Sequence, residues 1–145
     1  MIDSPSTFSG ARSRDELLRR FIAGVRRKDR HALASLAVNR AEFAYLVYPG
    51  SRMSRPPYNQ PPDIEWMLLR ANSDGGLTKL LARADQLRPL GYHCTSKSER
   101  DGAVTVWSGC LVRVRGDTGV RELRLFGSVV EYHGRYKFTS YGSDL

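Results

Sequence analysis

Hydrophobic residues recur along the chain with two different periods, which separate a helical first part from a strand-rich last part. From Arg14 to Leu87 apolar residues return every three or four positions, as in amphipathic helices that bury one face. From Leu90 onward apolar and polar residues alternate, as is typical of half-buried strands. Because the helices precede the strands, the pattern predicts an α+β fold with N-terminal helices packed on an antiparallel sheet.

Three of the predicted helices begin next to a residue whose side-chain oxygen can cap free backbone amides. In two of them an acid follows the cap by three residues, which is the capping-box pattern. We place the caps at Ser13, Asp29 and Asn39, with the first two helices over Arg14–Lys28 and Arg30–Ala37.

A proline-rich connection over Pro49–Pro62 interrupts the helical part. Five of the seven prolines of the chain lie there, so the segment can be neither regular helix nor central strand. A helix is predicted from Pro62 to about Ser73. We expect the Asp74-Gly75-Gly76 sequence to end it, and a separate helix to follow up to Pro89.

The last third of the chain predicts a curved antiparallel sheet. A first strand over 90–96 is followed by three consecutive strands over Val104–Arg115, Val120–Tyr132 and Tyr136–Tyr141. Gly109 and Gly127 lie in mid-strand, where glycine permits a sharp bend or bulge. We therefore expect a strongly curved, four-stranded (or so) antiparallel sheet that forms a cone with the helices.

Counting residues through the turns assigns the strand side chains to two faces. The inner face, apolar or small and expected to meet the helices, comprises Val106, Ser108, Cys110, Val112, Leu123, Leu125, Gly127, Val129, Phe138 and Ser140. The outer face alternates aromatic and cationic residues and comprises Trp107, Leu111, Arg113, Arg124, Phe126, Ser128, Val130, Lys137, Thr139 and Tyr141. Aromatic residues and arginine are enriched at interfaces, so this face predicts a homodimer through the open side of the sheet.

Length and composition indicate one globular domain. The chain has 145 residues, enough for a real core, and we expect a flexible tail over residues 1–12 and a domain over 13–145. The sequence contains no run of 18 apolar residues, so it predicts no membrane span. Residues 1–12 contain no apolar core of the kind found in signal peptides. The sequence does not decide the cellular compartment of the protein. As it stands, it predicts a cytoplasmic protein.

The net charge of +8 comes mostly from scattered arginines. We interpret the dense runs Arg19-Arg20 and Arg26-Arg27-Lys28 as solvated helix surface. The basic and aromatic outer face would also suit single-stranded nucleic acid. We favour the dimer over a nucleic-acid partner, since interfaces between copies have the same composition.

The two cysteines, Cys94 and Cys110, lie 16 residues apart, and alternation points both inward. Two interpretations stay open: buried thiols in a cytosolic protein, or a cross-strand disulfide in an exported one whose signal was removed. The sequence holds no CxxC motif and no histidine cluster of ligand spacing, so we predict neither a metal nor a cofactor.

Several segments resemble the NTF2-like (SnoaL-like, cystatin-like α+β) superfamily, and in particular a bacterial branch of it. The resemblance covers residues 13–145 and depends on the order of elements and on three stretches. These are Ala41-Glu42-Phe43-Ala44-Tyr45-Leu46 with Tyr48-Pro49, Leu125-Phe126-Gly127-Ser128, and the strand that ends at Tyr141. It implies a conical fold with a hollow. It does not imply one function, because the scaffold hosts enzymes, ligand binders and dimerisation modules.

We favour ligand binding as the function of this hollow, which would then be a small pocket with apolar walls. The polar and aromatic residues expected to line it are Tyr45, Tyr48, Tyr58, Trp66, Arg70, Ser108, Tyr136 and Ser140. We predict a small apolar or weakly anionic ligand, with Arg70 as its charged partner. The alternative is a non-catalytic interaction module in which the same aromatics simply fill the core.

Enzymatic activity is left open, and we favour a non-catalytic protein. The inner strand face carries no acid, and His31, His93 and His133 do not converge with one. An isomerase or dehydratase would need an acid from the proline-rich connection or from Asp144.

Overall fold

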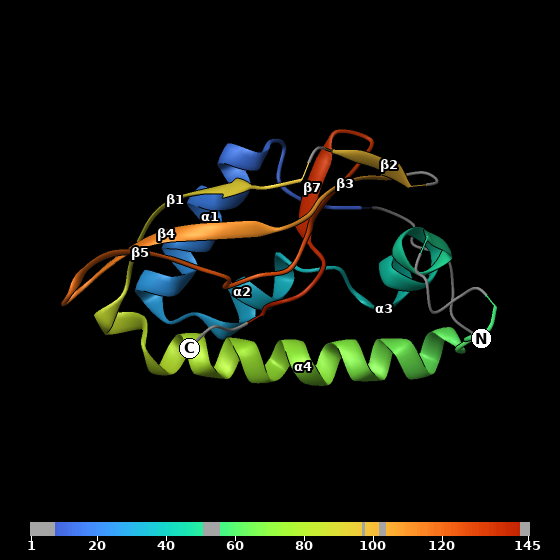
Figure 1. The fold of residues 1–145 in the computed structure, drawn as a ribbon, viewed down its shortest axis with the longest axis horizontal. Helices are drawn as coiled ribbons and strands as arrows, with labels where there is room; N and C mark the ends of the chain where they lie inside the picture. Colours follow the sequence, from blue (N-terminus) through green and yellow to red (C-terminus); the bar gives the residue numbers. More distant parts are fainter. Residues whose placement is uncertain (1–7, 51–55, 97, 102–103, 143–145) are drawn as a thin grey trace.

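The computed structural model of the chain describes residues 8–50, 56–96, 98–101 and 104–142. The helical part precedes the strands, as the sequence predicts, and one face of the long helix α4 borders the rest of the fold (Figure 1). The helical elements are α1 (Arg14–Arg27), α2 (Arg30–Ser35), α3 (Arg40–Glu42), the π-helical turn η1 (Phe43–Val47), the 3-10 turn η2 (Tyr48–Gly50), α4 (Pro62–Ala82) and the 3-10 turn η4 (Ala84–Gln86).

In the described residues seven strands form two antiparallel sheets, so the α+β prediction is confirmed and the prediction of one four-stranded sheet is wrong. The strands are β1 (Arg88–Cys94), β2 (Glu99–Asp101), β3 (Val104–Trp107), β4 (Cys110–Gly116), β5 (Gly119–Leu123), β6 (Val129–Tyr132) and β7 (Arg135–Phe138). A three-stranded sheet has the order β1-β4-β5, and a four-stranded sheet has the order β2-β3-β6-β7. Two of the long predicted strands are each broken in the middle, at residues 108–109 and 124–128, and their halves join different sheets.

These breaks overturn part of the predicted face assignment. Trp107 lies opposite Val129, which lies opposite Phe138, whereas Val106 lies opposite Val130 and Lys137. Val106 therefore does not share a face with Val129 and Phe138, because residues 108–109 interrupt the alternation that the prediction assumed to be continuous. Leu125 and Phe126, which are consecutive, are both fully buried because they lie in the second break, at residues 124–128, where alternation does not hold.

The helix caps agree with the sequence. Ser13 Oγ accepts a hydrogen bond from the Glu16 amide at 3.0 Å, and Asp29 caps α2 through the Ala32 amide. Asn39 and Glu42 form a complete capping box. In α1 the Glu16 carboxylate instead accepts from the amide of Arg12, one residue earlier than a capping box requires.

Helix α4 is continuous from Pro62 to Ala82, so the predicted break at the two glycines is wrong. Glycine weakens a helix by about 1 kcal/mol relative to alanine but does not stop one that packing holds. Gly76 is buried, and a Cβ there would approach the carbonyl oxygens of Tyr141 and Gly142 to 2.8 and 2.9 Å. This glycine allows the C-terminal segment to lie directly against the helix.

The N-terminal segment belongs to the fold from Ala11 at the latest, which corrects the predicted tail over 1–12. Ala11 is fully buried and exchanges two backbone hydrogen bonds with Tyr136 on the outer edge of β7. Leu36 and Val38 pair with Phe138 further along the same edge. Residues 1–7 of that predicted tail lie outside the described residues.

The main core is packed with aromatic rings from helix and strand. Phe21 of α1 contacts Phe126 and Phe138 edge to face, at centroid distances of 5.4 and 5.8 Å. Phe126 and Phe138 stack at 4.0 Å. All three side chains are fully buried. The space between α1 and the sheets is thus filled at this point.

Among the described residues, no helix is long and apolar enough to cross a membrane.

Candidate ligand-binding cleft

A cleft of about 550 Å³ lies between α2, α4 and the end of β7. Its volume falls within the range of small-molecule sites. The cleft is lined by Ser9, Ala34, Ser35, Ala37, Val38, Asn39, Arg40, Trp66, Leu69, Arg70, Ser73, Asp74, Leu77, Lys137, Thr139 and Tyr141. Of the predicted pocket residues, only Trp66 and Arg70 are in this set.

One wall of the cleft is a stripe of α4. Trp66, Arg70, Ser73 and Leu77 follow one another at spacings of four, three and four residues, which places them on one side of the helix. Trp66 also packs on Phe43 at a centroid distance of 5.6 Å. The stripe runs past Gly75 and Gly76, where the sequence was expected to end the helix. The spacing of these four residues would point to one helix face only if a single helix were predicted through the two glycines.

A buried ion pair lies beside the cleft. Lys137 Nζ lies 2.9 and 3.1 Å from the two carboxylate oxygens of Glu42, and the two side chains keep only 7% and 1% of their surface exposed. Glu42 Oε1 also accepts the amide of Asn39. The capping box of α3 therefore holds the carboxylate in place for the lysine. The Lys137 ammonium also lies 5.4 Å from the ring of Phe8.

The cations that line the cleft differ in how strongly they are engaged. Lys137 is held by Glu42, and Arg40 makes a close ion pair with Asp63 at 2.6 Å. Arg70 reaches Asp74 only at 3.8 Å, and its side chain keeps 67% of its surface exposed. An exposed pair at that distance contributes little. Arg70 is therefore the lining cation most available to an acid group.

Tyr141 is the lining residue nearest the C-terminus of the chain. Its hydroxyl donates to the carbonyl of Leu33, and its amide donates to Ser73 Oγ at 2.9 Å. Burial raises the pKa of this tyrosine far above its usual range, so the hydroxyl stays protonated. The contacts tie the C-terminal segment to both α2 and α4.

The other residues predicted for the pocket lie elsewhere. Tyr45 and Tyr58 are about half exposed at the surface, and the Tyr48 hydroxyl donates to the carbonyl of Gln60. Ser108 makes hydrogen bonds with Ser96 and Ser128. Tyr136 packs on Trp107 at 5.8 Å, and the carbonyl of Ser140 accepts from Gly127.

The predicted outer face is not an open surface. Phe126, Lys137 and Tyr141 are buried. The side of the four-stranded sheet that carries Val130 is covered by a second apolar cluster of Val38, Phe43 and Val130, with Phe8, Val47, Tyr48, Trp66, Leu69 and Val106 packed around it. The prediction failed because the segment from residue 39 to η2 folds over this side.

The remaining members of that face are dispersed. Leu111 and Arg113 lie on the solvent side of the three-stranded sheet, and Arg124 is exposed. Trp107 packs against the main core with the Arg14 guanidinium 4.9 Å from its ring. In the part of the chain that the structure describes, these residues therefore do not form one continuous surface.

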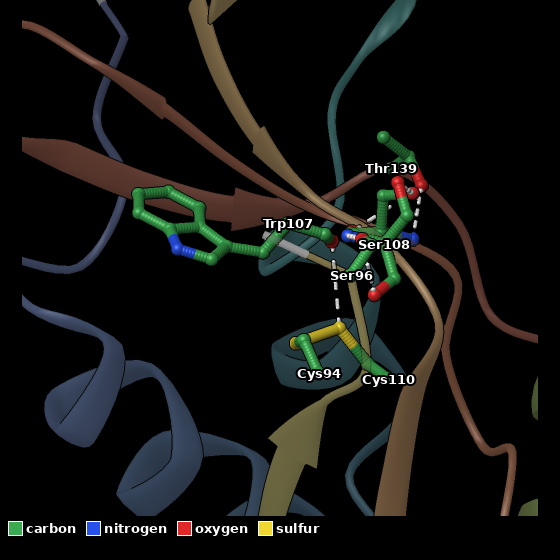
Figure 2. Close-up of a disulfide and its surroundings, with 7 residues drawn as sticks. Cys94, Ser96, Trp107, Ser108, Cys110 and Thr139 are labelled. Carbon is green, nitrogen blue, oxygen red and sulfur yellow. Dashed lines mark hydrogen bonds between the residues drawn. A yellow bond between two sulfur atoms is a disulfide. The ribbon is translucent and has the colours of Figure 1, made fainter. Parts of the chain in front are cut away.

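Cys94 and Cys110 lie directly opposite each other on β1 and β4 and are joined by a disulfide (Figure 2). The bond lies where the chain passes from β3 to β4. Cys110 Sγ is 3.4 Å from the carbonyl oxygen of Trp107, which is a packing contact because a disulfide sulfur carries no hydrogen. Beyond the bond, Thr95 and Ser96 continue to pair with residues 108 and 109.

The three histidines lie on different elements and do not line the cleft. His93 faces Glu122 at 3.8 Å on the exposed side of the three-stranded sheet, and His133 stacks on Tyr132 in a turn. His31 is exposed on α2. No group of three or more histidine, cysteine or acidic side chains in this part of the chain could hold a metal ion.

No family model, curated protein or solved structure matches the chain.

Proposed function

We propose that this protein binds a small, mostly apolar ligand with an acid group in the cleft between α2, α4 and β7, and that it acts without catalysis. The single observation that carries the proposal is the cleft itself, with a volume of about 550 Å³ and a wall that combines Trp66, Leu69 and Leu77 with the Arg70 guanidinium. Apolar walls with a few fixed polar groups are typical of small-molecule sites.

The acid group is inferred from Arg70. A guanidinium offers several donors in a plane that matches a carboxylate or phosphate. Its contact with Asp74 is long and exposed, so a ligand would displace little. The apolar part of the ligand would then lie against Trp66 and Val38.

We further propose that the fold is of the NTF2-like kind, with strands that curve around a cone. The support is the order of elements and the two strand breaks, at residues 108–109 and 124–128, where the chain changes sheet. In that case the cleft would be the side entrance of the cone, because the aromatic core fills its centre.

A matched pair of ligands tests the proposal. In a Trp107→Phe background, Trp66 is the only tryptophan, and its fluorescence should respond to decanoate and to decanol. Arg70→Gln should weaken decanoate by about tenfold, the value of one charge-assisted hydrogen bond, and leave decanol unchanged. Ala34→Phe, which fills the cleft from its exposed rim, should abolish both signals.

Arg19→Gln on α1 is the control for net charge and should bind as the parent does. Equal binding by Ala34→Phe and the parent would place the ligand outside the cleft. No response to either ligand, or to a wider set of hydrophobic acids, would favour the second candidate. This is a non-catalytic interaction module, which the filled aromatic interior favours.

A further inference from the structure

Helix α4 carries a second apolar face, which is exposed toward the N-terminal end of the helix. Ile64, Met67 and Leu68 keep 44%, 61% and 50% of their surface exposed, although large apolar side chains usually find a partner. In Figure 1 the helix runs along one edge of the molecule, with the sheets and the other helices all on the same side of it. In this view no other described helix or strand lies on the opposite side of α4.

The exposed face follows a regular spacing. Its residues succeed one another at intervals of four, three, four, three and four positions, which is the spacing of a coiled-coil seam. The seam consists of Ile64, Leu68, Ala71, Gly75, Thr78 and Ala82. At its C-terminal half the Thr78 hydroxyl accepts a hydrogen bond from the Arg30 guanidinium of α2 at 2.9 Å. The buried residues Gly76, Leu77 and Leu80 lie on the other side of the same helix. From Ile64 to Ala82 the seam is about 27 Å long.

Side-chain size falls along the seam from one end to the other. Ile64 and Leu68 occupy the N-terminal half, whereas Gly75 and Ala82 occupy the C-terminal half. A Cβ added at Gly75 would meet no atom within 4 Å, so there is open space beside the helix at this point. Two such seams fit when they run in opposite directions, because each large half then faces the small half of the other.

We infer that α4 is the dimerisation surface of this protein, and that it packs against α4 of a second copy in antiparallel orientation. The two-fold axis passes between Ala71 and Gly75. Ile64 then faces Ala82 of the second copy, and Leu68 faces Thr78. A two-fold axis requires a self-complementary surface, and the size gradient supplies one.

The helix dipoles agree with this orientation. The two dipoles are opposed in an antiparallel pair, which is favourable. In a parallel pair they would point the same way.

Sedimentation velocity between about 1 and about 100 µM tests the surface, because specific dimers of modest size dissociate in this range. The parent should move from monomer to dimer across it. Leu68→Glu should remain monomeric, and its thermal midpoint should stay that of the monomer, since Leu68 is half exposed. Val120→Glu, at a site of equal exposure on β5, should dimerise as the parent does.

Chemical cross-linking tests the orientation. Both native cysteines are in the disulfide, so an introduced cysteine is the only thiol. A short bis-maleimide should join an Ile64→Cys chain to an Ala82→Cys chain, and should not join two Ile64→Cys chains. Cross-linking between two Ile64→Cys chains would overturn the antiparallel arrangement. A monomeric parent at 100 µM, or a dimer unaffected by Leu68→Glu, would overturn the surface and leave α4 to a different partner.

Discussion

The three-stranded sheet and the four-stranded sheet come from the same stretch of chain, but they are covered differently. The three-stranded sheet buries one face, with Val112, Val114 and Leu123 inside and Arg113 and Arg115 in solvent. The four-stranded sheet is covered on both faces, so the consecutive residues Val129 and Val130 are both buried. β7 shows the same pattern, because Phe138 enters the aromatic core and Lys137 enters the pair with Glu42.

The difference predicts how much stability the protein loses when a charged residue on each kind of strand face is substituted. On the exposed face of the three-stranded sheet, a charged side chain keeps its water and interacts weakly with its neighbours. On the second face of the four-stranded sheet, a charged side chain has lost its water and depends on one partner. The predictions below compare matched substitutions on the two sheets, beginning with the largest effect.

Lys137→Met should lower the free energy of unfolding by about 3–5 kcal/mol, because it leaves the Glu42 carboxylate buried without a counter-charge. Arg113→Met, a change of the same kind on the solvent face of the other sheet, should change it by less than about 0.5 kcal/mol. Urea unfolding of both variants measures the difference.

The double variant Glu42→Met with Lys137→Met separates charge from packing. It should recover most of the loss, since replacing a buried pair by apolar groups is often nearly neutral. If the double variant is as unstable as Lys137→Met, the loss comes from packing and the comparison of the two sheets fails at this position.

Gly109 lies at the point where the chain passes between the two sheets. Its φ is +65°, and a Cβ there would come within 2.1 Å of Thr95 Oγ1. Gly109→Ala should therefore cost about 1–3 kcal/mol, in the range of a strained backbone position. The addition of Thr95→Ala should relieve the clash but not the backbone strain. Full recovery in that double variant would show that the positive φ is not required.

Two tyrosines contrast a satisfied hydroxyl with an unsatisfied one. The Tyr141 hydroxyl donates to Leu33, whereas the buried Tyr92 hydroxyl on β1 has no hydrogen-bond partner among the described residues. Tyr141→Phe should cost about 1 kcal/mol, the net value of one hydrogen bond, and Tyr92→Phe should cost close to nothing. Thermal unfolding at neutral pH compares the two; an equal loss in both would contradict the assignment.

Alkaline pH gives the same tyrosines a second readout. Burial raises the pKa of Tyr92 to about 12, and the ordinary value is about 10. Between these values the unfolded chain has lost the proton that the folded chain retains, so stability should fall as the pH rises from about 10 to about 12. Tyr92→Phe should show a smaller fall in the urea midpoint, and an unchanged pH dependence would argue against the buried hydroxyl.

The sequence predicts the three-stranded sheet better than the four-stranded one, for the reason that separates them structurally. Alternation places Cys110, Val112 and Leu123 inside correctly, because only one face of that sheet is buried. Val129 and Val130 are both buried and therefore show no alternation of apolar and polar residues, because the segment from residue 39 to η2 covers the second face. Local signals such as the cap at Asn39 could be predicted, but not where the capped segment would fold.

The same limit applies to the cleft. Trp66 and Arg70 were predicted for the pocket from their residue types, whereas Lys137 and Tyr141 were assigned to the opposite side of the sheet. Both assignments depended on one continuous strand from Val120 to Tyr132, and the break at residues 124–128 removed that basis. Glycine at 75 and 76 was likewise interpreted as the end of a helix, although packing against Tyr141 keeps the helix continuous.

The smallest effect is expected on the exposed face itself, where Arg88 and Arg115 lie directly opposite each other on β1 and β4. Like charges in this position are unfavourable, so Arg88→Gln should stabilise the protein by about 0.2–1 kcal/mol at low salt. Arg121→Gln, opposite Val114, should have no such effect. Because screening is strong in about 1 M NaCl, the gain should vanish there. A gain in stability that persists in salt would mean that Arg88 destabilises the fold through packing and not through charge. It would then contradict the view that charged side chains on this exposed face interact only weakly with their neighbours.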